Sequence, residues 1–123
     1  NALTPDEVKE TYRRFMEEEG EEITIRRYFG TGLNRNKFEV DVLARIIGYM
    51  PSELVGTIQQ GDQKLIVLVD DLERFQFPLP LVKNDKVVIK RHGNDKELNI
   101  ESADGNTRRI NSELIAYELQ VRG

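Results

Sequence analysis

Apolar residues recur at helical spacing at the start of the chain. Residues 4–20 predict an α-helix because their apolar side chains fall on one stripe; these are Val8, Tyr12, Phe15 and Met16. Thr4 and Glu7 have the spacing of a capping box, and Pro5 suits the first helical position. Gly20 is expected to follow the helix in the left-handed conformation that favours glycine.

After Gly20 the apolar period changes to two, which is typical of strands with one buried face. It predicts strands at residues 22–28, 38–49, 64–69, 86–91, 97–102 and 113–122. In the last strand the residues expected to face the core are Ile115, Tyr117, Leu119 and Val121. Those expected to face solvent are Ala116, Glu118, Gln120 and Arg122. Gly48 predicts a bulge or a sharp bend.

Short connections separate these strands. His92–Asp95 and Asp104–Gly105 predict turns, and residues 70–77 predict one helical turn capped by Asp70 or Asp71. None of the connections is long enough for a parallel crossover, so the sheet should be antiparallel.

The predicted fold is therefore mainly β, in a single domain over residues 1–123. We expect a small antiparallel β-barrel of about six strands at residues 22–122, with one N-terminal α-helix at residues 4–20. A closed or nearly closed barrel with the helix against it would bury every apolar face described above.

Composition narrows the function classes. The chain has no cysteine, which excludes disulfides and thiolate metal sites and is compatible with a reducing cytosol. No apolar stretch approaches the roughly 18 residues of a membrane span, so no membrane association is expected. The net charge of −4 argues against nucleic-acid binding over the whole surface. Charged residues make up 33% of the chain with both signs mixed, which indicates a well-solvated surface.

Candidate reactive groups are sparse. The motif at residues 30–32, Gly-Thr-Gly, leads into a strand rather than a helix, which favours a hairpin loop over a phosphate loop. His92 is the only histidine, which disfavours a metal or triad role. Asp62, Asp70 and Asp71 could form a carboxylate cluster, but turn and capping roles explain all three. We therefore predict no enzyme and no catalytic, cofactor-binding or metal-binding residue.

Three basic pairs leave two interpretations open. Arg13-Arg14, Arg26-Arg27 and Arg108-Arg109 could form a patch for DNA or an acidic partner, or they could be scattered surface charge. Aromatic residues beside basic ones, as a stacking platform needs, occur only where residues 28–29, Tyr-Phe, follow the second pair.

The connection from Met50 to Gln63 is unusually long for a small domain, which indicates a functional loop. Its apolar residues Leu54, Val55 and Ile58 could pack on the barrel or anchor a partner. The loop at residues 30–37 is a second candidate contact. The predicted partner-binding residues are Leu54, Ile58, Gln59, Gln60, Asp62, Arg35 and Lys37.

Several segments resemble the head–tail joining, or head-completion, proteins of tailed phages and prophages, which include stopper-like proteins. The matching segments are GYMPSELVGTIQQGDQKLIV from Gly48, DDL from Asp70 with the later Pro78-Leu79-Pro80, NDKVV from Asn84, ELIAYELQVRG from Glu113, and EEITIRR from Glu21 followed by Gly-Thr-Gly. The likeness covers about residues 4–123. It departs at Asn84, where the family pattern suggests glycine, and at residues 90–109, which carry more charge.

The resemblance implies a structural protein of the virion without catalysis. Such proteins are small β-barrels that bind beneath the portal or connector ring once DNA is packaged, and they close the channel or present a surface to the tail. The implied partners are the portal or head–tail connector, a tail terminator or tail-tube protein, and further copies of the chain in a ring, with packaged DNA adjacent. The implied location is the head–tail interface of the virion, and the bacterial host cytoplasm before assembly.

Two other roles remain as alternatives. One is a different neck or tail protein, such as a tail terminator or a minor tail protein. The other is a small β-barrel that binds nucleic acid, which the acidic balance disfavours.

Overall fold

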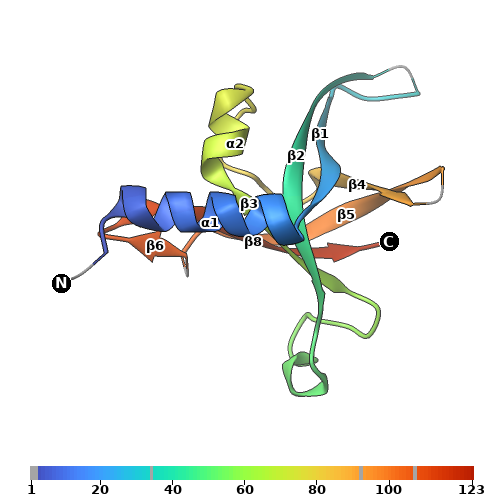
Figure 1. Cartoon of the computed structure of the whole chain (residues 1–123). Helices are drawn as coiled ribbons and strands as arrows, with labels where there is room; N and C mark the ends of the chain where they lie inside the picture. Colours follow the sequence, from blue (N-terminus) through green and yellow to red (C-terminus); the bar gives the residue numbers. More distant parts are fainter. Residues whose placement is uncertain (1–2, 34, 92, 107) are drawn as a thin grey trace.

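The computed structural model describes residues 3–33, 35–91, 93–106 and 108–123 and contains a closed antiparallel β-barrel with a helix across one side (Figure 1). The strands pair in the order β1-β2-β3-β8-β5-β4, and β4 closes on β1. The predicted fold class is thereby confirmed. In chain order the elements are α1 (Pro5–Glu19), β1 (Glu21–Phe29), β2 (Asn36–Gly48), the 3₁₀ turn η1 (Pro51–Glu53), β3 (Gln63–Leu68), α2 (Val69–Arg74), β4 (Lys86–Arg91), β5 (Asn94–Asp104), β6 (Arg109–Ile110), β7 (Glu113–Leu114) and β8 (Ala116–Arg122).

The long strand β2 joins two parts of the barrel. Its first part, to Ala44, pairs with β1, and the part from Ala44 to Gly48 pairs with β3. Of the two features predicted at Gly48, a bulge or a sharp bend, the bulge is wrong, because the pairing with β3 stays in register there. The register shift lies instead in β5, between Ile100 and Ser102, where that strand pairs with β8. A local bend at this point helps β5 turn from β4 toward β8.

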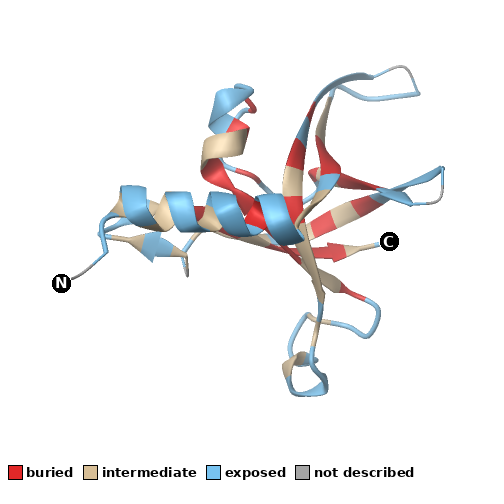
Figure 2. Cartoon of the chain, viewed as in Figure 1, coloured by how far each residue is buried: buried red, intermediate tan, exposed pale blue. Residues whose placement is uncertain are grey.

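Alternate residues of the strands fill the barrel, as Figure 2 shows. Ile25, Leu65, Ile100 and Leu119 are all fully buried in this core. The four inward positions predicted at residues 113–122 are confirmed, but two of the predicted outward residues are buried. Ala116 packs in a second cluster beneath α1, and Gln120 reaches the base of the β2–β3 loop.

Helix α1 begins with the predicted capping box. The Glu7 backbone N–H donates to Thr4 Oγ1 (3.2 Å), and the Thr4 N–H donates to Glu7 Oε1 (3.3 Å). Near the other end, Met16 is buried with Ile66, Leu68 and Ala116. The left-handed conformation predicted for Gly20 is wrong, since its φ is −83°. Glycine fits here because a Cβ would lie 2.6 Å from the Met16 carbonyl oxygen.

Several other boundaries differ from prediction. The strand predicted at 97–102 extends over β5, and that predicted at 113–122 is interrupted at Ile115, whose N–H donates to the Arg108 carbonyl. The β6–β7 hairpin was not predicted. Helix α2 begins after Leu68 without a side-chain cap, so capping by Asp70 or Asp71 is wrong.

His92 lies outside the described residues. Within the described ranges, no helix is long and apolar enough to cross a bilayer.

Candidate partner-binding surfaces

The β2–β3 loop extends away from the barrel at the lower end of β2 in Figure 1. It has its own internal structure. The Met50 N–H donates to Glu53 Oε1 (2.8 Å), and Lys64 Nζ lies 2.9 Å from Glu53 Oε2. Further along, the Ile58 N–H donates to the Val55 carbonyl (3.2 Å). The loop is therefore a shaped surface rather than an open chain.

The base of this loop is fixed by Asp62, whose side chain is 1% exposed. Its Oδ1 accepts from Arg122 Nε (2.8 Å), and its Oδ2 accepts from Arg122 Nη2, Gln120 Nε2 and the Gln59 N–H, each at 2.9 Å. Arg122 and Gln120 also donate to the Thr57 carbonyl. The hydrogen bonds from Arg122 hold the pKa of Asp62 well below its usual range. Asp62, predicted to bind a partner, is instead buried and positions the loop.

The other predicted loop residues have different environments. Leu54 and Val55 face solvent, with 37% and 67% of their surface exposed. Gln59 and Gln60 are exposed as well. Ile58 is half-buried and lines a shallow hollow of about 220 Å³ beside the barrel. Ile58 is therefore partly covered, whereas Leu54 and Val55 remain uncovered.

The β1–β2 hairpin projects at the opposite end of β2 (Figure 1). Gly30 and Gly32 have φ values of 80° and 92°, so this motif forms a hairpin loop as predicted. Leu33 is completely exposed. The two predicted contact residues here are also exposed: Lys37 Nζ lies 3.3 Å from a Glu39 carboxylate oxygen, whereas Arg35 forms no salt bridge within the described part of the chain.

A second buried aspartate fixes the segment before β4. Asp85 Oδ1 and Oδ2 accept from Arg27 Nε and Nη2, both at 2.7 Å, and Oδ2 accepts from the Val82 N–H at 3.0 Å. Arg27 Nη2 also donates to the Pro80 carbonyl (3.0 Å). Asn84, which stands where the resemblance suggests glycine, has a φ of 77°, which asparagine adopts more readily than most residues. A bidentate pair therefore holds this short loop rigid.

Above this pair lies a basic groove of about 330 Å³. Its lining residues come from β1, the β1–β2 loop and the segment leading into β4: Arg27, Tyr28, Arg35, Val82, Lys83, Asn84, Asp85 and Lys86. The guanidinium carbon of Arg35 lies 3.9 Å from the centre of the Tyr28 ring. Sequence reasoning noticed Arg27 and Tyr28 but missed Lys83 and Lys86, because only the fold brings β4 beside β1.

The three predicted basic pairs do not form one patch. Arg26 binds Glu39 and Glu97 (2.8 and 2.6 Å). Arg108 donates to the Tyr12 hydroxyl (2.9 Å) on α1, beneath which β8 runs. Of the six arginines, Arg27 alone lines the basic groove.

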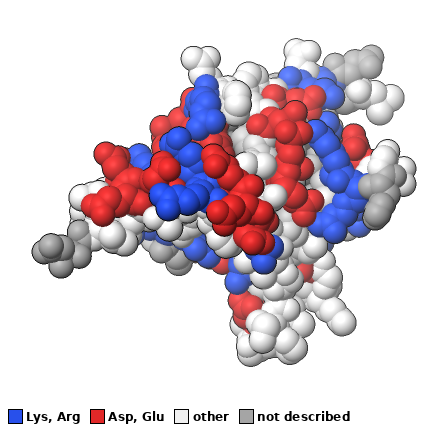
Figure 3. Space-filling model, in the orientation of Figure 1, with Lys and Arg blue, Asp and Glu red and all other residues white. Residues whose placement is uncertain are grey.

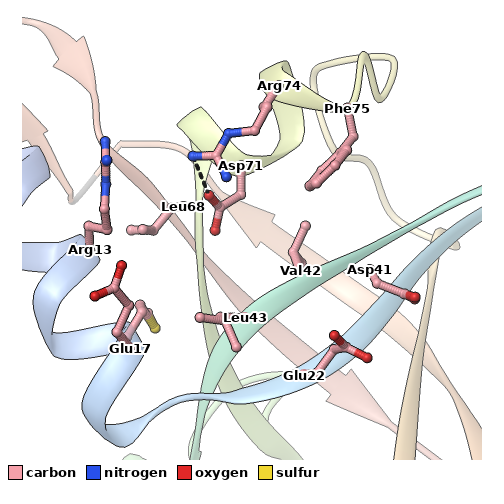
Figure 4. Close-up of a pocket in the computed structure, with 11 residues that line it drawn as sticks. Arg13, Glu17, Glu22, Asp41, Val42, Leu43, Leu68, Asp71, Arg74 and Phe75 are labelled. Atoms are coloured by element: carbon pink, nitrogen blue, oxygen red, sulfur yellow. Dashed lines mark ion pairs between the residues drawn. The ribbon is translucent and has the colours of Figure 1, made fainter.

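A hollow of about 540 Å³ lies between α1, α2 and β2 (Figure 4). Its floor is apolar, and its rim carries four carboxylates and two guanidinium groups: Glu17, Glu22, Asp41, Asp71, Arg13 and Arg74. Burial raises the pKa of Asp71, and Arg74 lies 3.3 Å from its carboxylate. Figure 3 shows Asp and Glu gathered over α1 and the adjacent sheet, with Lys and Arg among them.

The carboxylate cluster that the sequence analysis disfavoured does not form. Asp62 lies before β3, whereas Asp70 and Asp71 lie beyond the other end of that strand, about 20 Å away. Asp70 pairs with Lys9 (3.5 Å). Among the described residues there is no group of three or more side chains suited to hold a metal ion.

The chain was compared with known proteins: it matches no family model, and no curated protein or solved structure is significantly similar to it. Functional inference therefore depends on three features of the molecule. These are the closed barrel, the projecting β2–β3 loop and the basic groove beside the β1–β2 loop.

Proposed function

We propose that this protein is a structural subunit in the neck of a tailed phage or prophage particle, joining the portal or connector of the head to the tail. The segments that resemble head–tail joining proteins suggest the role. The β2–β3 loop is the observation that carries it, because this loop combines a fixed base with uncovered apolar side chains.

The fixed base reduces the cost of binding. Asp62, Gln120 and Arg122 order the loop before any partner arrives, so little conformational entropy remains to be lost on association. Met50 and Val55 expose 64% and 67% of their surface. Uncovered apolar side chains grouped on a projecting loop are typical of a surface that becomes buried in an assembly.

In the proposed neck, the loop contacts a neighbouring copy, the portal or the tail. Head-to-tail contacts between copies would close into a ring around the DNA channel. The β1–β2 hairpin, with Arg35 and Lys37, is the second contact and lies at the opposite end of β2. The ring would close the channel after packaging or receive the tail.

Electron microscopy of particles from a phage or induced prophage that lacks this gene tests the role. We expect DNA-filled or leaking heads beside complete, unattached tails, because neither half can dock without the joint. Restoring the gene should restore joined particles. Intact, infectious virions from the deletion would overturn the proposal.

A second experiment tests the loop. We replace Leu54 by Ser and both Gln59 and Gln60 by Ala, and expect a stable, folded protein that does not restore joined particles. The matched control carries three exposed substitutions on the β4–β5 hairpin, D95A, K96A and N94A, and should restore them. If the loop variant assembles virions as well as the control does, the contact surface lies elsewhere.

A further inference from the structure

The basic groove holds three cationic side chains that form no salt bridge with any described residue. Within the described ranges, Arg35, Lys83 and Lys86 take part in no salt bridge, although many other cations of the chain do. Lys86 Nζ donates to the neutral Asn99 Oδ1 (2.7 Å), and its charge acts at longer range on Glu97, whose pKa it helps to lower. The three side chains line one groove and come from two segments: Arg35 from the β1–β2 loop, and Lys83 and Lys86 from the segment that leads into β4.

Among the described residues that line the groove there is one carboxylate, Asp85, and its charge is already paired. Asp85 is buried and its two oxygens accept from Arg27 and from the Val82 N–H, so its negative charge is compensated by the Arg27 guanidinium. Glu39 and Glu97 lie nearby, and both are paired with Arg26. The groove therefore carries a local positive charge on a chain whose net charge is −4.

We propose that this groove binds the phosphodiester backbone of double-stranded DNA. Its lining is basic and polar with one exposed apolar side chain, Val82, which is the composition of a protein–DNA interface rather than of a protein–protein interface. Lysine and arginine side chains on a rigid frame suit phosphate oxygens. The Asp85–Arg27 pair supplies that frame.

The groove contacts the backbone and not the bases. The Tyr28 ring is covered by the Arg35 guanidinium, and the Tyr28 hydroxyl donates to Glu97 Oε2 (2.7 Å). This ring is therefore not presented for stacking on an unpaired base. Binding should consequently be independent of sequence and no tighter for single strands.

Three free cations set the strength of the site. About three neutralised phosphates give a slope of about −2.7 in log K against log salt, so affinity should fall about 40-fold between about 50 and 200 mM salt. Near physiological salt the dissociation constant should lie in the range of non-specific binding, about 10⁻⁴ to 10⁻⁶ M, and binding should be tighter at the lower salt.

The test is fluorescence anisotropy of a labelled 20-base-pair duplex (about two helical turns) titrated with the purified full chain at several salt concentrations. The groove variant is R35Q/K83Q/K86Q. The control variant, K90Q/R91Q/K96Q, removes the same charge from the β4–β5 hairpin. We expect the groove variant to lose at least 10-fold in affinity and most of the salt slope, and the control to stay within about threefold of the wild type.

Three results would overturn the proposal: no duplex binding at 50 mM salt, equal losses in both variants, or tighter binding of polyglutamate or single-stranded DNA than of the duplex. Circular dichroism of each variant verifies that it is folded. The proposal goes beyond the neck role, because it concerns the binding of duplex DNA by the purified protein and not the assembly of particles. Failure here leaves the particle morphology of the gene deletion unchanged, so the two proposals fail separately.

Discussion

Two aspartates, Asp62 before β3 and Asp85 before β4, are held in the same way but support different surfaces. Each accepts two hydrogen bonds from one arginine and a third from the backbone N–H three residues earlier. Each arginine, Arg122 or Arg27, also donates to a carbonyl of the loop that it fixes. The Asp62 pair supports a loop with exposed apolar residues, and the Asp85 pair supports a basic groove.

The comparison shows how a small barrel can carry ordered loops. A loop outside the core has few apolar contacts, so charge-assisted hydrogen bonds supply the order that packing gives to strands. Asp62 accepts one bond more than Asp85, from Gln120, and Arg122 also binds Glu101. The longer loop therefore has the larger network.

The largest expected effect comes from removing the aspartates. Asp62→Ala should lower the free energy of unfolding by about 3 kcal/mol, because it removes one of the two acceptors of the buried Gln120 amide and the carboxylate that accepts from Arg122 Nε and Nη2. Asp85→Ala should cost about 1 kcal/mol less, since one fewer donor is orphaned. Urea denaturation measures both.

Hydrogen exchange locates each effect. Asp62→Ala should speed exchange at the Gln59 amide, and Asp85→Ala at the Val82 amide, with little effect of either on the other loop. The control is Asp95→Ala on the exposed β4–β5 hairpin, which should change stability by less than about 0.5 kcal/mol. Equal losses for Asp95→Ala and Asp62→Ala would contradict the structural role of the buried pairs.

A smaller effect separates the two arginines. Lysine cannot form two parallel bonds to a carboxylate. Arg27→Lys should cost about 2 kcal/mol, because Arg27 is 19% exposed and lies 5.3 Å from the Phe77 ring. Arg122→Lys should cost less, since that side chain is 32% exposed and water can replace its bonds. A larger loss of stability for Arg122→Lys than for Arg27→Lys in urea denaturation would mean that burial does not set the strength of the two arginine–aspartate pairs.

The smallest effect is the response to acid. Because the folded pKa of Asp62 is lowered, its contribution to stability is complete above the unfolded pKa of about 4 and is lost as the pH falls below it. The stability difference between the wild type and Asp62→Asn should therefore shrink between pH 4 and pH 2. Taking the difference cancels the response of other carboxylates. A difference that grows in acid would contradict the lowered pKa.

The fold could be predicted because it follows from local patterns. The capping box of Thr4 and Glu7, the alternation in β2 and β8, and the shortness of the connections together specify a helix and an antiparallel barrel. The β6–β7 hairpin was missed because its strands have two residues each, too few to show a period. The one local sign of this hairpin in the sequence was the turn-forming pair Asn111-Ser112, and both residues have positive φ values in the structure, 50° and 68°.

The surfaces were harder to predict because they depend on distant partners. Asp62 looked like an exposed turn residue, and only its pairing with Arg122 on β8 buries it. Lys83 and Lys86 gave no signal beside Arg35, which lies far from them in the sequence. The sequence alone does not decide whether Leu54 and Val55 pack on the barrel or face solvent, because the answer depends on where the base of the loop is fixed.

The most direct test of the neck assignment is a cryo-electron microscopy reconstruction of the neck of the virion that carries this gene. We expect density for the barrel at the head–tail joint, with Leu54 and Val55 of the β2–β3 loop buried against a neighbouring subunit. A neck without this barrel, or one in which the loop faces solvent on every copy, would contradict it.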